Sequence, residues 1–387
     1  MISKEHRKHS HLSKPSYGIF SRNEWAITGA NSMLTEKLAD AVIRRLAPVY
    51  KCAYADALPP GNDIPDHLPE RLVAGAVAHY SYSGDFHQVT YKTPINKFAY
   101  RQLLADADLV IVNGNHLEAS AQVIVIDPNT QALLKERLPV LTNVKMFVLA
   151  EHEIDVFDFV KEAVPAWQHL PVYHIDDTDK IIGFFAEEMK RVKPVVNGLV
   201  LAGGKSVRMG ADKGLMMWHG KEQRYFMADL LEAFTQDVFI SCRADQQGDI
   251  DKSYKTIEDS FTGLGPYGAI LSAFRMQPDS AWLVIACDLP LIDAATIEYL
   301  VKHRKQSAMA TTFENPANHF PEPLIAIWEP KSYPILLSLL SQGYTCPKKA
   351  LQSHDAFMLV APRADALLNV NTPEDKARAG IILQHGS

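Results

Sequence analysis

The sequence predicts an α/β fold with two domains, each a mainly parallel sheet flanked by helices. Three observations lead to this prediction. The chain has 387 residues, which is longer than a typical domain with a single hydrophobic core. Short apolar runs alternate with longer amphipathic stretches, as in sheets whose parallel strands are joined by helices. The dipeptide Lys193-Pro194 separates two such series, because proline disfavours helix in the residue before it. We therefore expect domains at 1–192 and 193–387.

Composition and charge are those of an ordinary soluble protein. Hydrophobic residues make up 47%, charged residues 22%, and the net charge is −6, so there is no overall case for nucleic-acid or membrane binding. No apolar run reaches the ~20 residues of a membrane span, and the four cysteines lack metal-ligand spacing. We expect a cytoplasmic protein with reduced thiols. The basic, histidine-rich stretch 4–14 is interpreted as a solvated tail, with a metal site or anion clamp as the alternative.

Residues 1–192 show buried strands separated by helical patterns. Leucine and valine recur with helical spacing over 34–46, and a second helix is expected at 181–191, closing the domain. The near-continuous apolar run 108–113 is typical of a strand buried on both faces. The strands predicted for this domain are 24–28, 50–54, 108–113, 122–126 and 146–149.

The second series begins with a predicted strand, 196–201, that runs directly into Ala202-Gly203-Gly204. Glycines after a strand let backbone N–H groups surround an anion, and Arg208 and Lys213 add fixed positive charge nearby. The spacing alone also fits an ordinary strand–turn–helix connection, and the Walker A pattern is absent. Further strands are predicted at 238–241, 282–286, 308–312 and 324–328.

The loop pattern L-A-G-G-x-S-x-R-M-G-x-D-K at 201–213 resembles the signature of the molybdenum cofactor guanylyltransferase family, often called MobA. The resemblance implies a Rossmann-like nucleotidyltransferase fold for 193–387, with GTP as the nucleotide and molybdopterin as the acceptor. It also implies that the loop wraps the nucleotide and that two basic side chains act in catalysis on the triphosphate. The residues so assigned are Leu201, Ala202, Gly203 and Gly204 for nucleotide binding, Lys213 for both roles, and Arg208 for catalysis.

Further motifs follow in the order of the same family. Asp259 precedes a glycine-rich turn, and in the family such an aspartate lies at the nucleoside while the turn lines the base pocket. The structural alternative is a loop shaped only by turn chemistry. The resemblance adds four nucleotide-binding candidates, which are Asp259, Gly265, Pro266 and Gly268.

Two motifs indicate a metal site. Asp288 follows an apolar strand and precedes Leu289-Pro290, where ligands of open α/β sheets bind. Mg²⁺ prefers oxygen ligands and takes few protein carboxylates. The segment Asn369-Val-Asn371-Thr-Pro-Glu resembles the family's closing motif. We expect Mg²⁺ at Asp288 and Asn371, with Asn369 as the alternative, and Asp288 as a catalytic residue. The structural alternatives are a strand-end turn at Asp288 and a helix cap at Thr372.

The resemblance implies that the phosphate of molybdopterin attacks the α-phosphorus of GTP and that pyrophosphate leaves. No histidine or carboxylate base stands in the motifs, and an anionic phosphate needs none. Two alternatives remain, namely a CTP-dependent cytidylyltransferase and a non-catalytic nucleotide-binding chaperone of molybdoenzymes. The segment 241–245 departs from the pattern that relatives often carry there, and 319–324 is the region expected to face the pterin. The identity of the acceptor is therefore less defined than that of the nucleotide. The pair Lys348 and Lys349 is either a ligand of the pterin phosphate or a solvated helix start.

The first half resembles a degenerate form of MobB, the P-loop GTP-binding partner of the guanylyltransferase. The runs 108–114 and 121–126 are similar to its later strands, but Asn113 stands where that family often has an acidic residue. The turn 27–33 lacks the phosphate lysine. We therefore expect no NTPase chemistry, and a role as scaffold, dimerisation or pterin-delivery module. The alternative is an unrelated α/β domain. A homodimer and contacts with molybdoenzymes or other cofactor-biosynthesis proteins are further expectations.

Overall fold

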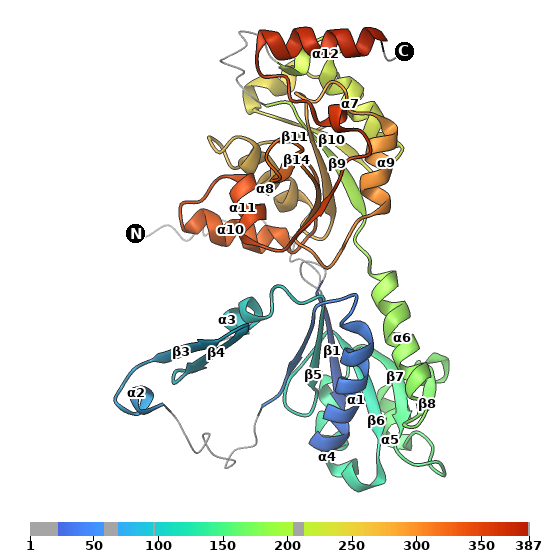
Figure 1. Cartoon of the computed structure of the whole chain (residues 1–387). Coiled ribbons are helices and arrows are strands. Elements are labelled where there is room, and N and C mark those ends of the chain that lie inside the picture. Colours follow the sequence, from blue (N-terminus) through green and yellow to red (C-terminus); the bar gives the residue numbers. More distant parts are fainter. Residues whose placement is uncertain (1–21, 58–68, 96, 204–212, 386–387) are drawn as a thin grey trace, which may run out of the picture. The chain divides into compact units, whose positions relative to one another are not determined.

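The computed structural model describes residues 22–57, 69–95, 97–203 and 213–385. These residues form two compact units, one of Arg22–Met189 and one that begins at Lys190 (Figure 1). Among the helices described, none combines the length and the apolar character needed to cross a membrane.

The first unit contains a six-stranded sheet in the order β2-β5-β1-β6-β7-β8. Every neighbouring pair in this sheet is parallel, so all six carboxyl ends lie at one edge. The central strands are fully buried, as expected for a sheet covered on both faces. The strands are β1 (Asn23–Thr28), β2 (Cys52–Ala55), β5 (Leu109–Asn113), β6 (Ala121–Ile126), β7 (Val144–Leu149) and β8 (Val172–His174).

Helices cover both faces of this sheet. The helices α1 and α6 pack on one face, where Leu38 and Phe185 meet Trp25 and Val123. The other face carries α4 and α5, with Leu134 among the residues of its apolar cluster. The α-helices of the unit are α1 (Ser32–Leu46), α2 (Glu70–Val73), α3 (Lys97–Leu103), α4 (Gln131–Arg137), α5 (Asp158–Ala163) and α6 (Thr178–Arg191), and its short 3₁₀ helices are η2 (Pro128–Thr130), η3 (Leu138–Val140) and η4 (Trp167–His169).

A separate antiparallel hairpin interrupts the unit between β2 and β5. Within the described residues, its strands β3 (Ala78–Ser83) and β4 (Phe86–Tyr91) pair only with each other. Large side chains on the hairpin are exposed, including Tyr82 at 71% and Phe86 at 84%. The sequence analysis did not predict these strands, because their exposed residues lack the apolar runs of a buried strand.

The second unit contains a seven-stranded sheet in the order β11-β10-β9-β12-β14-β13-β15. Four neighbouring pairs are parallel, and β14 runs antiparallel to both β12 and β13. Its strands are β9 (Val196–Leu201), β10 (Val238–Cys242), β11 (Lys255–Glu258), β12 (Ala281–Ala286), β13 (Ala310–Glu314), β14 (Pro321–Trp328) and β15 (Ala356–Leu359).

Helices again cover both faces of the sheet. The helices α7 and α9 pack on one face through residues such as Leu231 and Ile297. The helices α8, α10 and α11 cover the other face, where Phe274 lies in one cluster with the paired tryptophans Trp282 and Trp328. The helices of this unit are η5 (Lys213–Leu215), α7 (Gln223–Glu232), η6 (Ala244–Asp249), α8 (Pro266–Met276), α9 (Ala294–Lys302), α10 (Ser332–Ser341), α11 (Pro347–Ser353), η7 (Ala364–Leu367) and α12 (Pro373–His385).

The predicted fold class, α/β with mainly parallel sheets flanked by helices, is confirmed. Each predicted strand is present, with ends that differ by a few residues. Besides the hairpin, the prediction omitted β8, β11 and β15, which have only three or four residues each. Such short strands carry too few residues to show a periodic pattern.

Candidate active site

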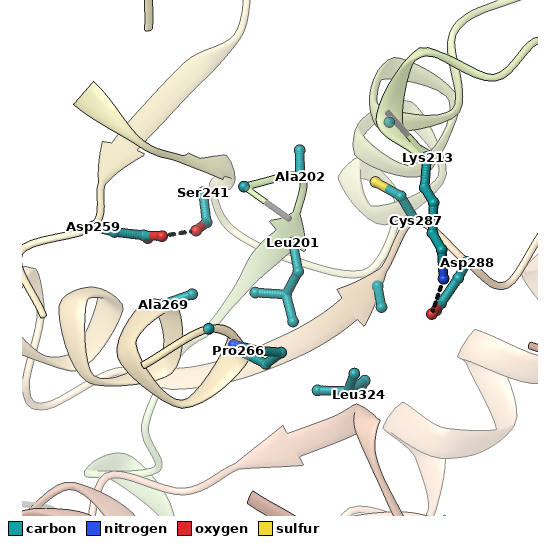
Figure 2. Close-up of a pocket in the computed structure, with 14 residues that line it drawn as sticks. Leu201, Ala202, Lys213, Ser241, Asp259, Pro266, Ala269, Cys287, Asp288 and Leu324 are labelled. Carbon is teal, nitrogen blue, oxygen red and sulfur yellow. Dashed lines mark hydrogen bonds and ion pairs between the residues drawn. The ribbon is translucent and has the colours of Figure 1, made fainter. Parts of the chain in front are cut away.

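A cavity of about 240 Å³ lies at the carboxyl edge of β9, β10, β11 and β12 (Figure 2). The sheet register aligns Leu201 at the end of β9 with Ser241 on one side and Ala286 on the other. Strand ends therefore converge where ligands of open α/β sheets bind. The cavity is lined by Leu201, Ala202, Gly203, Lys213, Gly214, Ser241, Asp259, Gly265, Pro266, Ala269, Ala286, Cys287, Asp288 and Leu324.

The absence of a side chain at Gly203 keeps this part of the cavity open. A Cβ atom added there would lie 3.3 Å from the Oδ2 atom of Asp259. The Nη1 group of Arg243 donates a hydrogen bond to the Gly203 carbonyl at 2.7 Å, which fixes the backbone at this point. Of the candidates in the same loop, Gly204 and Arg208 lie outside the described residues.

Asp259 presents a carboxylate to the cavity from the residue after β11. Its Oδ1 atom accepts a hydrogen bond from the Ser241 hydroxyl at 2.7 Å, and its backbone N–H donates to the Cys242 carbonyl at 3.0 Å. Burial raises the pKa of the Asp259 carboxyl, and the hydrogen bond from Ser241 acts in the opposite direction. The result is an acceptor group of fixed orientation in a partly desolvated wall.

The glycine turn opens helix α8 at the cavity. Gly265 has φ of 56°, a conformation that favours glycine, and Pro266 follows as the first residue of the helix. Gly268 has a packing role, because a Cβ atom there would lie only 2.1 Å from the carbonyl oxygen of Phe261. It is not among the residues that line the cavity. The turn thus needs glycine twice, at Gly265 for the backbone conformation and at Gly268 for the close packing of α8 against the loop at Phe261.

Three polar side chains from distant segments meet at one end of the cavity. The Nζ atom of Lys213 lies 3.2 Å from Oδ2 of Asp288 and 2.6 Å from Oδ1 of Asn371. The side chains of Lys213 and Asp288 are 21% and 17% exposed, so water screens their attraction only in part. The Oδ1 atom of Asp288 is buried and has no hydrogen-bond partner among the residues that the structure describes. A buried oxygen without a partner is costly and marks a place for a further ligand.

The closing motif is held against Asp288 by its backbone. The N–H of Val370 donates to the carbonyl oxygen of Asp288 at 2.8 Å. The Oδ2 atom of Asp375 accepts from the N–H groups of Asn371 and Thr372, each at 3.0 Å, and these bonds lower the pKa of the Asp375 carboxyl. The Thr372 hydroxyl accepts from the Asp375 N–H at 3.2 Å. The motif is therefore both the cap of α12 and a carrier of Asn371.

The site includes residues that the sequence analysis did not select. Ser241 stands at the end of a predicted strand, so the rule that ligands bind at carboxyl ends could have identified it. Ala269 lies one turn into α8, on the face of Pro266. Leu324 has no comparable signal, because it enters from β14, which runs antiparallel to its neighbours. Between Asn369 and Asn371, only Asn371 has a contact with Lys213 within the described part of the chain.

Known proteins match this half of the chain. Residues 198–357 match the model of the MobA-like NTP transferase domain. The molybdenum cofactor guanylyltransferase of Pseudomonas fluorescens (strain Pf0-1) is 30% identical over 189 residues, which are 47% of this chain and 92% of that protein. The chain belongs to the molybdenum cofactor guanylyltransferase family. It is thus a nucleotidyltransferase of molybdenum cofactor biosynthesis, as the sequence resemblance implied.

Three further proteins align with about half of this chain or slightly less, and they differ in how much of their own length is aligned. The molybdenum cofactor biosynthesis bifunctional protein of Synechocystis sp. is 36% identical over 179 residues, 46% of this chain and about half, 52%, of that protein. Molybdopterin-guanine dinucleotide biosynthesis protein A from Archaeoglobus fulgidus aligns with a TM-score of 0.41 and 23% identity, over 49% of this chain and 98% of that one. Bacillus subtilis MobB aligns with a TM-score of 0.34 and 13% identity, over 43% and 97%.

Nucleotidyltransferases of this family generally use a divalent metal ion, and the residues of this guanylyltransferase family member fit one. The Oδ1 atom of Asp288 is a buried oxygen that contacts no donor in the described part of the chain. The Oδ1 atom of Asn371 lies beside Lys213, the lysine that also contacts Asp288. Both are hard oxygen donors, the kind that small divalent cations prefer. The lysine contacts the other carboxylate oxygen, Oδ2, so a cation at Oδ1 does not require the ion pair to break.

Proposed function

We propose that the chain transfers the guanylyl group of GTP to the phosphate of molybdopterin and releases pyrophosphate. The observation that carries this proposal is the meeting of Lys213, Asp288 and Asn371 at one end of a cavity with glycine-rich walls. Such a site suits phosphate chemistry for two reasons. The glycines let a ligand approach the backbone closely, and the lysine supplies positive charge.

The proposed reaction is an in-line displacement at phosphorus. An oxygen of the molybdopterin phosphate forms a bond to the α-phosphorus of GTP, and the bond from that phosphorus to the α–β bridging oxygen breaks. Pyrophosphate leaves with the electron pair of the broken bond. A phosphate monoester has a second pKa of about 6, so it is already anionic at neutral pH and needs no general base. Catalysis then depends on positioning and on stabilising the developing charge.

The chain's own residues divide this work. The ammonium group of Lys213, oriented by Asp288 and Asn371, stabilises the charge that develops on the leaving pyrophosphate. We assign Arg208 to the same phosphates from its place in the motif alone. The backbone at Leu201, Ala202 and Gly203 borders the nucleotide.

We propose Mg²⁺ as the metal ion, held by Asp288 and Asn371. When bound, it supplies positive charge to phosphate oxygens and reduces their mutual repulsion. The oxygen donor set and its small number of protein ligands suit Mg²⁺, which keeps several waters and takes phosphate oxygens as further ligands.

The wall at Asp259 favours guanine over cytosine. An ionised carboxylate is purely an acceptor, and guanine offers two donors, N1–H and the N2 amino group, on one edge. Cytosine offers only its N4 amino group there, next to the acceptors N3 and O2, which a carboxylate repels. Ser241 already donates to Oδ1, which orients the carboxylate. We therefore propose GTP as the nucleotide, with CTP as the alternative.

The test is pyrophosphate release by the purified chain with Mg²⁺, molybdopterin and either GTP or CTP. We expect turnover with GTP and a large loss of turnover in Asp288→Asn. The matched control Asp365→Asn, at an exposed aspartate outside the site, should keep the turnover of the parent chain. Turnover with CTP alone would keep the chemistry but refute the assignment of the base. Binding of GTP without pyrophosphate release would favour the alternative of a non-catalytic chaperone.

We further propose that the first unit is a MobB-like domain without NTPase activity. Only Gly29, Ala30 and Asn31 lie between β1 and α1, too few to encircle a phosphate. Asn115 fills this turn, because its Oδ1 atom accepts from the Gly29 N–H at 3.0 Å and its Nδ2 group donates to the Ala30 carbonyl at 2.6 Å. The Gly29 N–H, a donor that could otherwise face an anion, is thus occupied. We propose the cytoplasm as the compartment, where thiols stay reduced, and the four cysteines form no disulfide among the described residues.

A further inference from the structure

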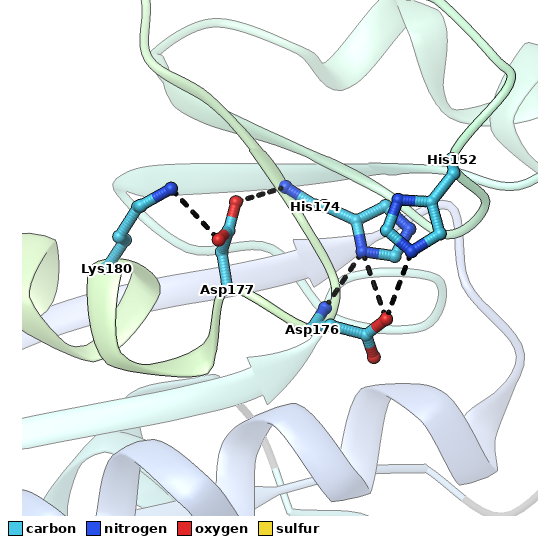
Figure 3. Close-up of polar contacts among 5 residues, drawn as sticks. All are labelled: His152, His174, Asp176, Asp177 and Lys180. Atoms are coloured by element: carbon cyan, nitrogen blue, oxygen red, sulfur yellow. Dashed lines mark hydrogen bonds and ion pairs between the residues drawn. The ribbon is translucent and has the colours of Figure 1, made fainter.

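Two histidines and an aspartate gather at the carboxyl edge of the first sheet, in the other unit from the nucleotide cavity (Figure 3). The strands β7 and β8 are parallel neighbours, so the segments that follow them emerge side by side. His152 lies in the turn after β7, His174 is the last residue of β8, and Asp176 precedes α6. The cluster lies on the side of the sheet where the strands have their carboxyl ends, which is the side on which α/β sheets bind ligands.

The three side chains point toward one another. The Oδ2 atom of Asp176 lies 3.4 Å from Nε2 of His152 and 3.3 Å from Nδ1 of His174. The imidazole rings are stacked with centroids 3.5 Å apart and an interplanar angle of 12°. One donor atom from each residue lies within 4.8 Å of the others.

We propose that His152, His174 and Asp176 bind one divalent transition-metal ion of the zinc type. Two imidazole nitrogens and one carboxylate oxygen are the donors that Zn²⁺ takes, whereas Mg²⁺ prefers oxygen alone. Two ligands of a tetrahedral ion with bonds of ~2.0–2.1 Å stand about 3.3 Å apart. The two nitrogen–oxygen distances already have this value. The fourth position is left for water or another ligand.

The surrounding contacts fix one part of the cluster and leave the other adjustable. The N–H of His174 donates to Oδ2 of Asp177 at 3.3 Å, and the N–H of Ile175 donates to the Leu149 carbonyl at 2.9 Å. The Nζ atom of Lys180 also lies 2.9 Å from Oδ1 of Asp177, and this contact lowers the pKa of the Asp177 carboxyl. His174 is thus held at the end of its strand.

Binding requires small movements, which the exposed residues allow. The side chains of His152 and Asp176 are each 76% exposed, so solvent surrounds most of each side chain. The stacked rings must open so that the ion lies in the plane of both. Nδ1 of His174 now accepts the N–H of Asp176 at 3.2 Å, which means that its lone pair faces the cluster. The ion replaces that hydrogen bond with a coordination bond.

The test is a zinc titration of the full chain by isothermal calorimetry, after removal of metals by a chelator and with Mg²⁺ in excess. The excess Mg²⁺ occupies oxygen-donor sites such as the one proposed at Asp288. The protein is prepared without an affinity tag. His6, His9 and His11 are changed to alanine in every sample, so that the histidine-rich stretch 4–14 cannot contribute zinc ligands. We expect one equivalent of Zn²⁺ to bind.

Matched variants assign the binding to the cluster. His152→Ala and Asp176→Asn should each weaken zinc binding at least about tenfold. His169→Ala and Asp179→Asn, at exposed positions of the same unit, should bind zinc as the parent does. Thermal melts of the metal-free proteins should coincide, since both changed ligands are exposed. Failure of the parent to bind zinc, or equal binding by the parent and the two ligand variants, would overturn the proposal.

Discussion

The Nζ atom of Lys213 lies 2.6 Å from the side-chain oxygen of Asn371, although the two residues are 158 positions apart in the chain. Asp288 completes the contact at 3.2 Å from the same nitrogen. The first and last of the sequence motifs therefore belong to one site, and the carboxylate between them is shared by the lysine and the proposed metal ion. This arrangement leads to predictions that separate the roles of the three residues.

Replacing Lys213 by alanine should lower kcat/KM for GTP by about 10²–10³-fold, the usual effect of losing one charged contact to a developing charge. The fall should appear mainly in kcat, since the contact strengthens as pyrophosphate leaves. The measurement is steady-state pyrophosphate release. Lys252→Ala, at an exposed position outside the site, is the control and should keep the parent rate. Equal rates for both variants would remove Lys213 from the mechanism.

The two asparagines of the closing motif should differ in their effects. Asn371→Ala removes the oxygen beside Lys213 and should reduce turnover and raise the Mg²⁺ concentration needed for half-maximal rate. Asn369→Ala should change neither quantity by more than a few fold. A Mg²⁺ titration of the rate in both variants measures this difference. The reverse order of effects would show that Asn369 is the residue near the metal.

Asp259→Asn should weaken discrimination between GTP and CTP. The amide retains one acceptor but places a donor where guanine also donates, so kcat/KM should fall for GTP and change less for CTP. Burial raises the pKa of the Asp259 carboxyl, so the wild-type chain should lose GTP affinity on acidification at a higher pH than an exposed aspartate would impose. The KM for GTP measured across pH should show this loss, and the Asn variant should lack it.

The cap of α12 should contribute to stability in a pH-dependent way. Hydrogen bonds from Asn371 and Thr372 lower the pKa of Asp375, so its contribution is present above the ordinary value of 3.8 and is lost as the pH falls through the lowered value. Asp375→Asn should flatten the acid side of the stability profile. Thr372→Ala should cost about 1 kcal/mol at neutral pH. Urea unfolding across pH measures both, and a profile unchanged in Asp375→Asn would contradict the assignment.

The first unit should not hydrolyse GTP. Asn115 occupies the turn after β1, and the lysine of a P-loop is absent from the segment 27–33. In the Asp288→Asn background, which suppresses the transferase, incubation of the full chain with Mg²⁺ and GTP should release no inorganic phosphate above a protein-free control. Steady phosphate release from this variant would refute the proposal of a domain without NTPase chemistry.

Much of the fold could be predicted from apolar runs, because a strand that is buried on both faces consists of consecutive apolar residues and so shows in the local sequence. The strand 108–113 and β5 (Leu109–Asn113) are an example. The hairpin β3–β4 could not be read in this way, since its aromatic residues face outward and its pairing involves only itself. The antiparallel course of β14, which brings Leu324 to the cavity, is likewise a property of sheet order and not of local spacing.

The sequence by itself determined the fold class, the family motifs and the residue types for phosphate and metal chemistry. Each of these is encoded within a short segment, where side-chain type, spacing and turn chemistry act locally. Only the tertiary structure decided that Asn371 contacts Lys213 and that Gly268 serves packing. It also brought His152 beside His174 and Asp176, which no motif indicated. These relationships depend on the order and register of parallel strands, and a chain reveals that order only once its crossovers have folded.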